Sequence, residues 1–146
     1  MNVIVTGASR GIGKAIATVF AAHGHDLFLT SRGEHALYQT MEELQTRFPA
    51  ITIKAKAFDL ANKDGAAAFA AWCTAQAVPD IVINNAGAFE PGSIYNEREG
   101  LLEEQLAINL FSAYHFTRAV LPPMMEKKAG HIFNICSIAA LKAYSN

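Results

Sequence analysis

A glycine-rich segment near the N-terminus constrains the fold of this chain more than any other feature. It reads TGASRGIG at residues 6–13, follows the apolar run at residues 3–5 and opens a helical pattern at residues 11–23. A glycine permits a tight strand-to-helix turn, and a missing Cβ lets a phosphate approach the backbone. The helix N-terminus then offers free N–H groups and a positive dipole end. Although glycines also mark ordinary turns, this position between a strand and a helix predicts a dinucleotide site.

Strand and helix patterns alternate along the rest of the chain. Apolar strand patterns occupy residues 3–5, 27–29, 51–58, 81–83 and 132–136, and helical patterns occupy residues 11–23, 33–48, 63–76 and 101–125. Alternation of this kind predicts a parallel sheet with helices on both faces. Continuous apolar strands are typical of sheets that are covered on both sides. We therefore predict an α/β fold, a doubly wound parallel sheet of the Rossmann type, in which residues 1–146 form the N-terminal, dinucleotide-binding portion of a single domain.

Three local features carry further structural expectations. The first helix has Ile12, Ile16, Val19 and Phe20 on one side, and Pro122 with Pro123 is expected to break the last turn of the long helix. No sixth strand or closing helix follows residue 136, and a sheet that stopped there would have a bare edge. We therefore expect the protein to continue beyond Asn146 with further strands and helices.

Composition excludes several classes of partner. Twelve basic and 13 acidic residues give a net charge of -1, so there is no basic field for nucleic acid or an anionic membrane. No apolar run approaches the roughly 18 residues of a membrane-spanning helix, and a strand pattern begins at once, where a signal peptide would lie. Cys73 and Cys136 form neither a CxxC motif nor a disulfide framework, and the five histidines have no metal-ligand spacing. We expect a cytoplasmic protein with a small-molecule substrate and no metal.

Three more motifs follow the glycine-rich segment in order. NNAG at residues 84–87 follows the fourth strand pattern, Asn109 lies in QLAINL at residues 105–110, and Ser137 follows the fifth strand pattern. With these motifs the chain resembles the short-chain dehydrogenase/reductase family over essentially its whole length, and it is similar to 3-oxoacyl-carrier-protein reductases and sepiapterin-reductase-like members. The resemblance implies reversible hydride transfer between NADP(H) and a carbonyl or alcohol substrate by a homo-oligomer, a dimer or tetramer.

The end of the second strand pattern bears on the choice of cofactor. An acidic side chain there would bond the ribose 2′-OH of NAD, but this chain has Ser31 and Arg32, with no acid until Glu34. Arg32, together with Arg10, can pair with the 2′-phosphate of NADP; the alternative is that both are ordinary solvated charges. Asp59 matches the family position at the adenine edge, and it could equally cap the next helix. The predicted cofactor-binding residues are Gly7, Ser9, Arg10, Gly11, Ile12, Gly13, Ser31, Arg32, Asp59, Leu60, Asn85, Ala86 and Gly87.

Asn109 and Ser137 are the predicted catalytic residues. Asn109 lies on the stripe Leu102, Leu106, Ala113, Phe116 and Val120, so we expect it to be buried and hydrogen-bonded. Its amide could simply tie to neighbouring backbone, whereas the resemblance implies that it helps to hold a proton-relay water. The resemblance also implies that Ser137 donates to the substrate carbonyl oxygen; otherwise it is a loop residue or helix cap. Cys136 is expected to fill the core.

A proton donor is still needed for carbonyl reduction. The resemblance implies a tyrosine a little over a dozen residues after Ser137, with a lysine four residues later, and both positions lie beyond Asn146. Tyr144 is too close to Ser137, so we assign it no catalytic role. The alternative function is a non-catalytic dinucleotide-binding module or sensor that lacks the tyrosine helix.

Overall fold

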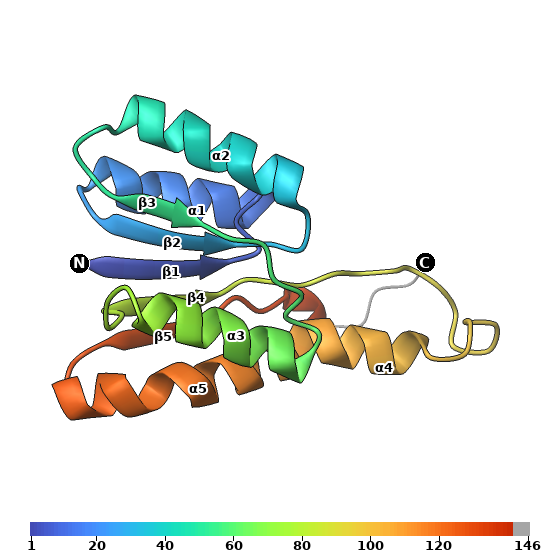
Figure 1. Cartoon of the computed structure of the whole chain (residues 1–146). Helices are drawn as coiled ribbons and strands as arrows, with labels where there is room; N and C mark the ends of the chain where they lie inside the picture. The colour runs from blue at the N-terminus through green and yellow to red at the C-terminus, as the bar shows by residue number, and fades with distance from the viewer. Residues whose placement is uncertain (142–146) are drawn as a thin grey trace.

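The computed structural model describes residues 1–141 and contains a five-stranded parallel sheet in the order β3-β2-β1-β4-β5 (Figure 1). The strands are β1 (Asn2–Thr6), β2 (Asp26–Thr30), β3 (Ile53–Ala55), β4 (Ile81–Asn84) and β5 (His131–Asn134). All four strand pairings are parallel, which confirms the predicted fold class. From β3 at one edge the chain returns to place β4 beside β1. The sheet therefore changes winding direction between β1 and β4, which is where such sheets bind ligands.

Helices cover both faces of this sheet, as Figure 1 shows. The helical elements are α1 (Gly11–Ala22), α2 (Glu34–Arg47), α3 (Lys63–Thr74), α4 (Leu101–Leu106), the π-helical turn η1 (Ala107–Phe111), α5 (Ser112–Lys127) and the 3-10 turn η2 (Ile138–Ala140). Helices α1 and α2 lie on one face, and α3 and α5 on the other. None of the described helices combines the length and apolar character needed to cross a bilayer.

Strand side chains alternate between two apolar clusters, one on each face. In β1, Val3 and Val5 pack on the α1–α2 side, whereas Ile4 packs on the α3–α5 side with Phe69 and Phe116. All five are fully buried. Each such side chain stabilises the fold by roughly 1.5–3 kcal/mol relative to an exposed one. The double-sided burial explains why the central strands are continuous apolar runs.

Helix α1 packs only partly through the predicted side, because Ile16 and Phe20 contact the α1–α2 core cluster but Ile12 and Val19 do not. Ile12 is 63% exposed and Val19 is 58% exposed, while Gly13, Ala17 and Ala21 are buried. The small residues allow the helix to approach the sheet closely: a Cβ on Gly13 would stand 2.2 Å from the Gly7 carbonyl oxygen. Close backbone approach here outweighs the burial of larger side chains.

The predicted long helix is divided by η1. A π turn holds one more residue than an α turn, so the buried face shifts: Phe116 and Val120 are buried, but Leu102 is 58% exposed. Asn109, in the shifted segment, is exposed rather than buried. The expectation of a break at Pro122 was also wrong, because α5 continues to Lys127. The two prolines remove donors to carbonyls of exposed residues, which water can satisfy.

Strand β5 differs most from the sequence expectation. Ile132 is half-buried against the α3–α5 cluster, but Phe133 is 49% exposed and Cys136 is exposed, so Cys136 is not core filler. Among the described residues β5 forms one edge of the sheet and pairs with β4 alone. At the other edge, β3 is shorter than the predicted residues 51–58.

Candidate functional site

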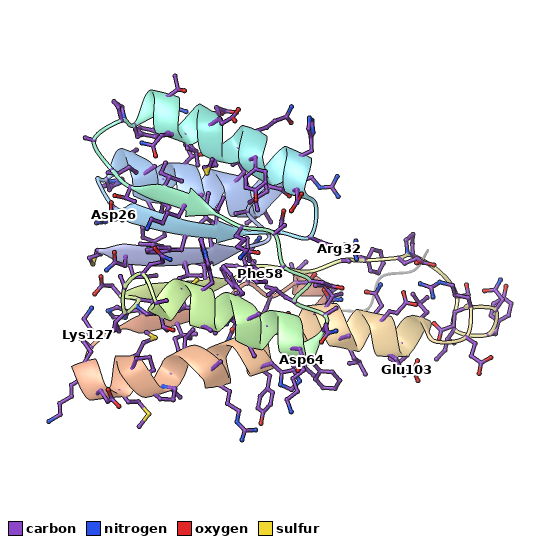
Figure 2. The ribbon with its side chains drawn as sticks, in the orientation of Figure 1. Asp26, Arg32, Phe58, Asp64, Glu103 and Lys127 are labelled. Atoms are coloured by element: carbon purple, nitrogen blue, oxygen red, sulfur yellow. The ribbon has the colours of Figure 1, made fainter. Side chains whose placement is uncertain are left out.

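A pocket of about 720 Å³ opens at the carboxyl ends of β1, β2 and β4. It brings together all the predicted cofactor-binding residues except Gly13. Sequence reasoning missed five further lining residues: Gly33, Ala36, Phe58, Ala88 and Ile108. Figure 2 shows Arg32 and Phe58 at this same end of the sheet. Four of them stand next to a predicted site residue in the sequence, whereas Ala36 lies in the first turn of α2 and carried no such signal.

The glycine-rich turn forms the floor of the pocket. Gly7 and Gly11 have φ values of 66° and 57°, which favour glycine. A Cβ on Gly11 would meet no atom within 4 Å, so the space above it is open. No side chain caps α1, and its first turn has no acidic residue. The unpaired N–H groups at this helix end can therefore receive an anion such as a phosphate.

Thr6, which the sequence did not single out, joins the glycine-rich turn to the loop after β4. Its buried Oγ1 accepts hydrogen bonds from the backbone N–H groups of Asn85 and Ala86, both at 2.9 Å, and donates to the Ile83 carbonyl at 3.3 Å. The Asn85 side chain donates back to the Thr6 carbonyl oxygen at 3.0 Å. These bonds fix two walls of the pocket against each other, which preorganises the site.

Two more threonines connect the pocket's remaining segments. The Thr30 hydroxyl at the end of β2 donates to the Lys56 carbonyl at 2.8 Å, and the Thr40 hydroxyl on α2 donates to the Ser9 carbonyl at 2.9 Å. Each hydroxyl satisfies a backbone acceptor in a loop. The loops are thereby held by the helices and strands rather than by ligand.

Arg10 and Arg32 line the pocket as unpaired cations. Both side chains belong to exposed residues, and neither forms an ion pair within residues 1–141. Glu34, the first acid after β2, begins helix α2. The electrostatic character of this part of the pocket is therefore positive, which suits an anionic group.

Asp59 lines the pocket but does not cap α3. Its Oδ1 accepts from the Ala61 N–H at 3.1 Å, while Asn62 is the N-cap and accepts from the Asp64 N–H at 2.8 Å. The helix-cap alternative for Asp59 is therefore wrong. A Cβ on Gly65 would stand 2.1 Å from the Asp59 carbonyl oxygen, so the first turn of α3 packs closely against the backbone of Asp59.

Asn109 holds the loop that follows β4. Its Oδ1 accepts from the Ala88 N–H at 2.9 Å, and its Nδ2 donates to the Ala88 carbonyl at 2.8 Å and to Gln105 Oε1 at 3.0 Å. This paired contact corresponds to the simpler alternative, an amide tied to neighbouring backbone. Because Ala88 lines the pocket, Asn109 fixes part of the pocket wall from outside.

Ser137 lies outside the pocket lining and is exposed. Its Oγ accepts from the Ala139 N–H at 3.1 Å and caps η2. Since the hydroxyl acts as acceptor there, its own proton is free to donate elsewhere.

Tyr144 lies outside the described residues. Burial raises the pKa of the Cys73 thiol, which disfavours its reactive thiolate.

Metal-ligating side chains do not cluster in the described part of the chain: no group of three or more His, Cys, Asp or Glu residues is placed to hold an ion. The pocket lining instead includes the hydroxyls of Ser9 and Ser31, the Asn85 amide, the two guanidinium groups and a single carboxylate, that of Asp59. These groups suit a phosphate-bearing organic ligand.

Comparison with known proteins gives a consistent result. A family model described as short chain dehydrogenase matches residues 1–146. The Bacillus subtilis (strain 168) protein "Uncharacterized oxidoreductase YvaG" is 35% identical over 142 residues, which cover 94% of this chain and 51% of that protein. Mouse (Mus musculus) "Dehydrogenase/reductase SDR family member 7B" is 38% identical over 145 residues, 93% of this chain and 43% of that protein. The chain thus spans about half the length of the curated relatives it matches.

Solved structures resemble the fold closely. L-sorbose reductase from Gluconobacter frateurii, complexed with NADPH and L-sorbose, has a TM-score of 0.91 at 27% identity, with 96% of this chain and 53% of that chain covered. A metagenomic short-chain oxidoreductase in complex with NADP has a TM-score of 0.91 at 33% identity, with 99% and 66% covered.

Proposed function

This chain belongs to the short-chain dehydrogenase family, and from that premise we propose that it binds NADP(H) and catalyses hydride transfer between this cofactor and a carbonyl or alcohol substrate. The observation that carries the proposal is the pocket at the carboxyl ends of β1, β2 and β4, with Arg10 and Arg32 in its lining. The relatives named as oxidoreductases do not favour the alternative of a non-catalytic binding module.

The pocket residues fit a dinucleotide. The open space above Gly11 and the uncapped N-terminus of α1 suit a pyrophosphate, because free N–H groups and the helix dipole favour negative charge. Phe58, Asp59 and Leu60 supply an apolar and acidic border for the adenine at the far side of the same pocket.

The arginine pair favours NADP(H) over NAD(H). Arg32 stands just after β2, where an acidic side chain would bond a ribose 2′-OH. Its guanidinium and that of Arg10 would instead pair with a 2′-phosphate in charge-assisted hydrogen bonds. Two of the similar solved structures are complexes with NADPH and NADP.

The chain's own residues would then position the reaction. When bound, the nicotinamide ring supplies or accepts the hydride. Asn85 to Ala88 border that end of the pocket, and Asn109 holds Ala88 in place. We assign to Ser137 a hydrogen bond from its free hydroxyl proton to the substrate oxygen, which would stabilise developing negative charge there.

Assembly and location complete the proposal. Exposed apolar side chains recur at spacings of four or seven residues from α4 to α5, at Leu102, Leu106, Leu110, Tyr114, Leu121 and Met125. We call this set the α4–α5 stripe and propose that a second copy of the chain covers it, because a two-fold pairing matches one stripe with the same stripe.

A cytoplasmic location is part of the proposal and rests on the two free cysteines, which are typical of reducing compartments.

Hydride transfer is tested directly by incubating the protein with nicotinamide-deuterated NADPH and a panel of ketones and aldehydes. We expect deuterium in the product alcohol, detected by mass spectrometry. We expect Ser137→Ala to lower kcat/KM by about 10²–10³-fold, the usual effect of removing one donor to a developing oxyanion. The neighbouring Cys136→Ser variant is the control and should retain activity. Tight NADPH binding without deuterium transfer to any carbonyl would instead support the binding module.

A further inference from the structure

The loop from Ala88 to Gly100 leaves the pocket and leads to α4. It begins at a fixed point, because the Asn109 amide bonds both the N–H and the carbonyl of Ala88. Figure 1 shows this loop extending past the N-terminal end of α4. A loop of this length would move freely unless a second contact held it.

Arg98 supplies that second contact. Its Nη1 and Nη2 donate to Glu104 Oε1 and Oε2 at 2.8 and 2.6 Å, and its Nη2 and Nε donate to Glu90 Oε2 and Oε1 at 3.3 and 3.4 Å. The hydrogen bonds from Arg98 lower the pKa of the Glu104 carboxyl. Exposed ion pairs usually contribute little, but bidentate geometry and a three-member network are the exceptions. We call these three residues the Arg98 clamp.

Phe89 lies between the two fixed points. Its neighbours are Ala88, held by Asn109, and Glu90, held by the Arg98 clamp. Phe89 is not itself a pocket-lining residue, but it directly follows one, Ala88, and its side chain is 83% exposed. A large aromatic side chain that is both exposed and anchored on either side is preorganised for contact with a ligand.

We propose that Arg98 is a positioning residue that, through Glu90 and Glu104, holds Phe89 at the pocket rim, where its ring selects carbonyl substrates with an aromatic or long alkyl group. This inference rests on the proposed function, since it names the substrate class of the same site. Phe89 contacts the apolar part of the substrate, and Arg98 acts through Phe89 without contacting the substrate.

Steady-state kinetics with two ketones tests the substrate class. We expect Phe89→Ala to raise KM for an aryl alkyl ketone about tenfold, because one aromatic contact is lost, with little change in kcat. The KM for acetone and the Kd for NADPH should not change. Ile94→Ala is the matched control, because Ile94 is 87% exposed on the same loop but is four residues in sequence from both Glu90 and Arg98. An unchanged ratio of the two KM values in Phe89→Ala would overturn the proposal.

The clamp is tested by Arg98→Ala, Glu104→Gln and the double variant. Each single change should raise KM for the aryl ketone about two- to fivefold, the range for an exposed charge pair. The KM of the double variant for the aryl ketone should be no higher than that of the single variants, because both changes break the same contact. Glu103→Gln removes the neighbouring carboxylate, which does not bond Arg98, and should have no effect. Additive effects, or an equal effect of Glu103→Gln, would overturn the role of Arg98.

Limited digestion with chymotrypsin reports on the loop without any turnover. Cleavage after Phe89 and Tyr95 should be faster in Arg98→Ala than in the wild type, and unchanged in Glu103→Gln. Equal cleavage rates in all three proteins would show that Arg98 does not restrain the loop. If NADPH binds but no ketone of either kind is reduced, the proposed function fails, and the inference about Phe89 fails with it.

Discussion

Gly11 and Gly13 stand two positions apart in the first turn of α1, yet their surroundings differ. Gly11 has a φ of 57° and open space where a Cβ would be, whereas a Cβ on Gly13 would stand 2.2 Å from the Gly7 carbonyl oxygen and 2.5 Å from Asn85 Nδ2. The sequence grouped both as cofactor-binding residues. Their spacing is visible in the sequence, but the atoms that each faces depend on the packing of α1 against the loop after β4.

Substitution should separate these two roles. We expect Gly13→Val to lower the free energy of unfolding by about 4 kcal/mol or more, since the clash is with backbone. Gly11→Ala should cost about 1–2 kcal/mol for its left-handed conformation, and should weaken NADPH binding because its Cβ enters the open space. Urea denaturation and NADPH titration measure the two effects. A stable Gly13→Val protein with normal NADPH affinity would contradict this assignment.

At the scale of elements, strand and helix positions were predictable but packing faces were less so. The apolar runs located the strands and indicated that they pair in parallel, because burial on both faces leaves a clear pattern. The π turn at η1 leaves no such pattern, and it moved Leu102 and Asn109 to the exposed side. The Arg98 clamp could not be predicted either, because Glu104 lies six residues away in α4 and Glu90 lies eight residues away in the loop.

Asp80 connects three elements at the end of the sheet opposite the pocket. Its Oδ2 accepts from the Asn2 N–H at 2.7 Å, and its Oδ1 pairs with Lys127 at the end of α5. Burial acts to raise the pKa of the Asp80 carboxyl, but hydrogen bonds from Lys127 and Asn2 and the charge of Lys127 outweigh it, so the pKa is lowered. A lowered folded-state pKa means that the ionised group stabilises the fold above its unfolded pKa of about 4.

The stability contribution of Asp80 should therefore depend on pH. We expect Asp80→Asn to lower the free energy of unfolding by about 1 kcal/mol at neutral pH. The difference between variant and wild type should shrink as the pH falls below about 4, through the folded-state pKa, where both side chains become neutral. Urea denaturation across this pH range provides the measurement. If the difference in the free energy of unfolding grew in acid, the pKa of Asp80 would be raised rather than lowered in the folded protein.

At the scale of the whole molecule, the parallel sheet explains why so many predicted residues meet in one pocket. The carboxyl ends of β1, β2 and β4 lie at the same edge, so short motifs far apart in the sequence converge there. Ser137 follows β5 at that edge but remains outside the pocket lining. Strand order could not be read from any single motif, and it came from the structure.

The proposed self-association through the α4–α5 stripe can be tested by substitution. We expect Tyr114→Lys to weaken dimerisation by at least about tenfold, because it places a charge in an apolar interface centred on this residue. Val19→Lys is the control, because Val19 is also an exposed apolar residue but lies on α1, outside the stripe. Sedimentation equilibrium over a range of concentrations gives the association constants. A monomeric wild type, or an unchanged association in Tyr114→Lys, would rule out the stripe as the interface.

The pocket is proposed to bind NADP(H) through Arg10 and Arg32. Calorimetric titration with NADPH and with NADH, on wild type and Arg32→Ala, measures it most directly. We expect wild type to bind NADPH at least about tenfold more tightly, since one charge-assisted contact supplies roughly 1.5–3 kcal/mol. Arg32→Ala should lose most of this preference and leave NADH affinity nearly unchanged. Equal affinities, or a preference for NADH that Arg32→Ala does not alter, would show that the arginines do not select NADP(H).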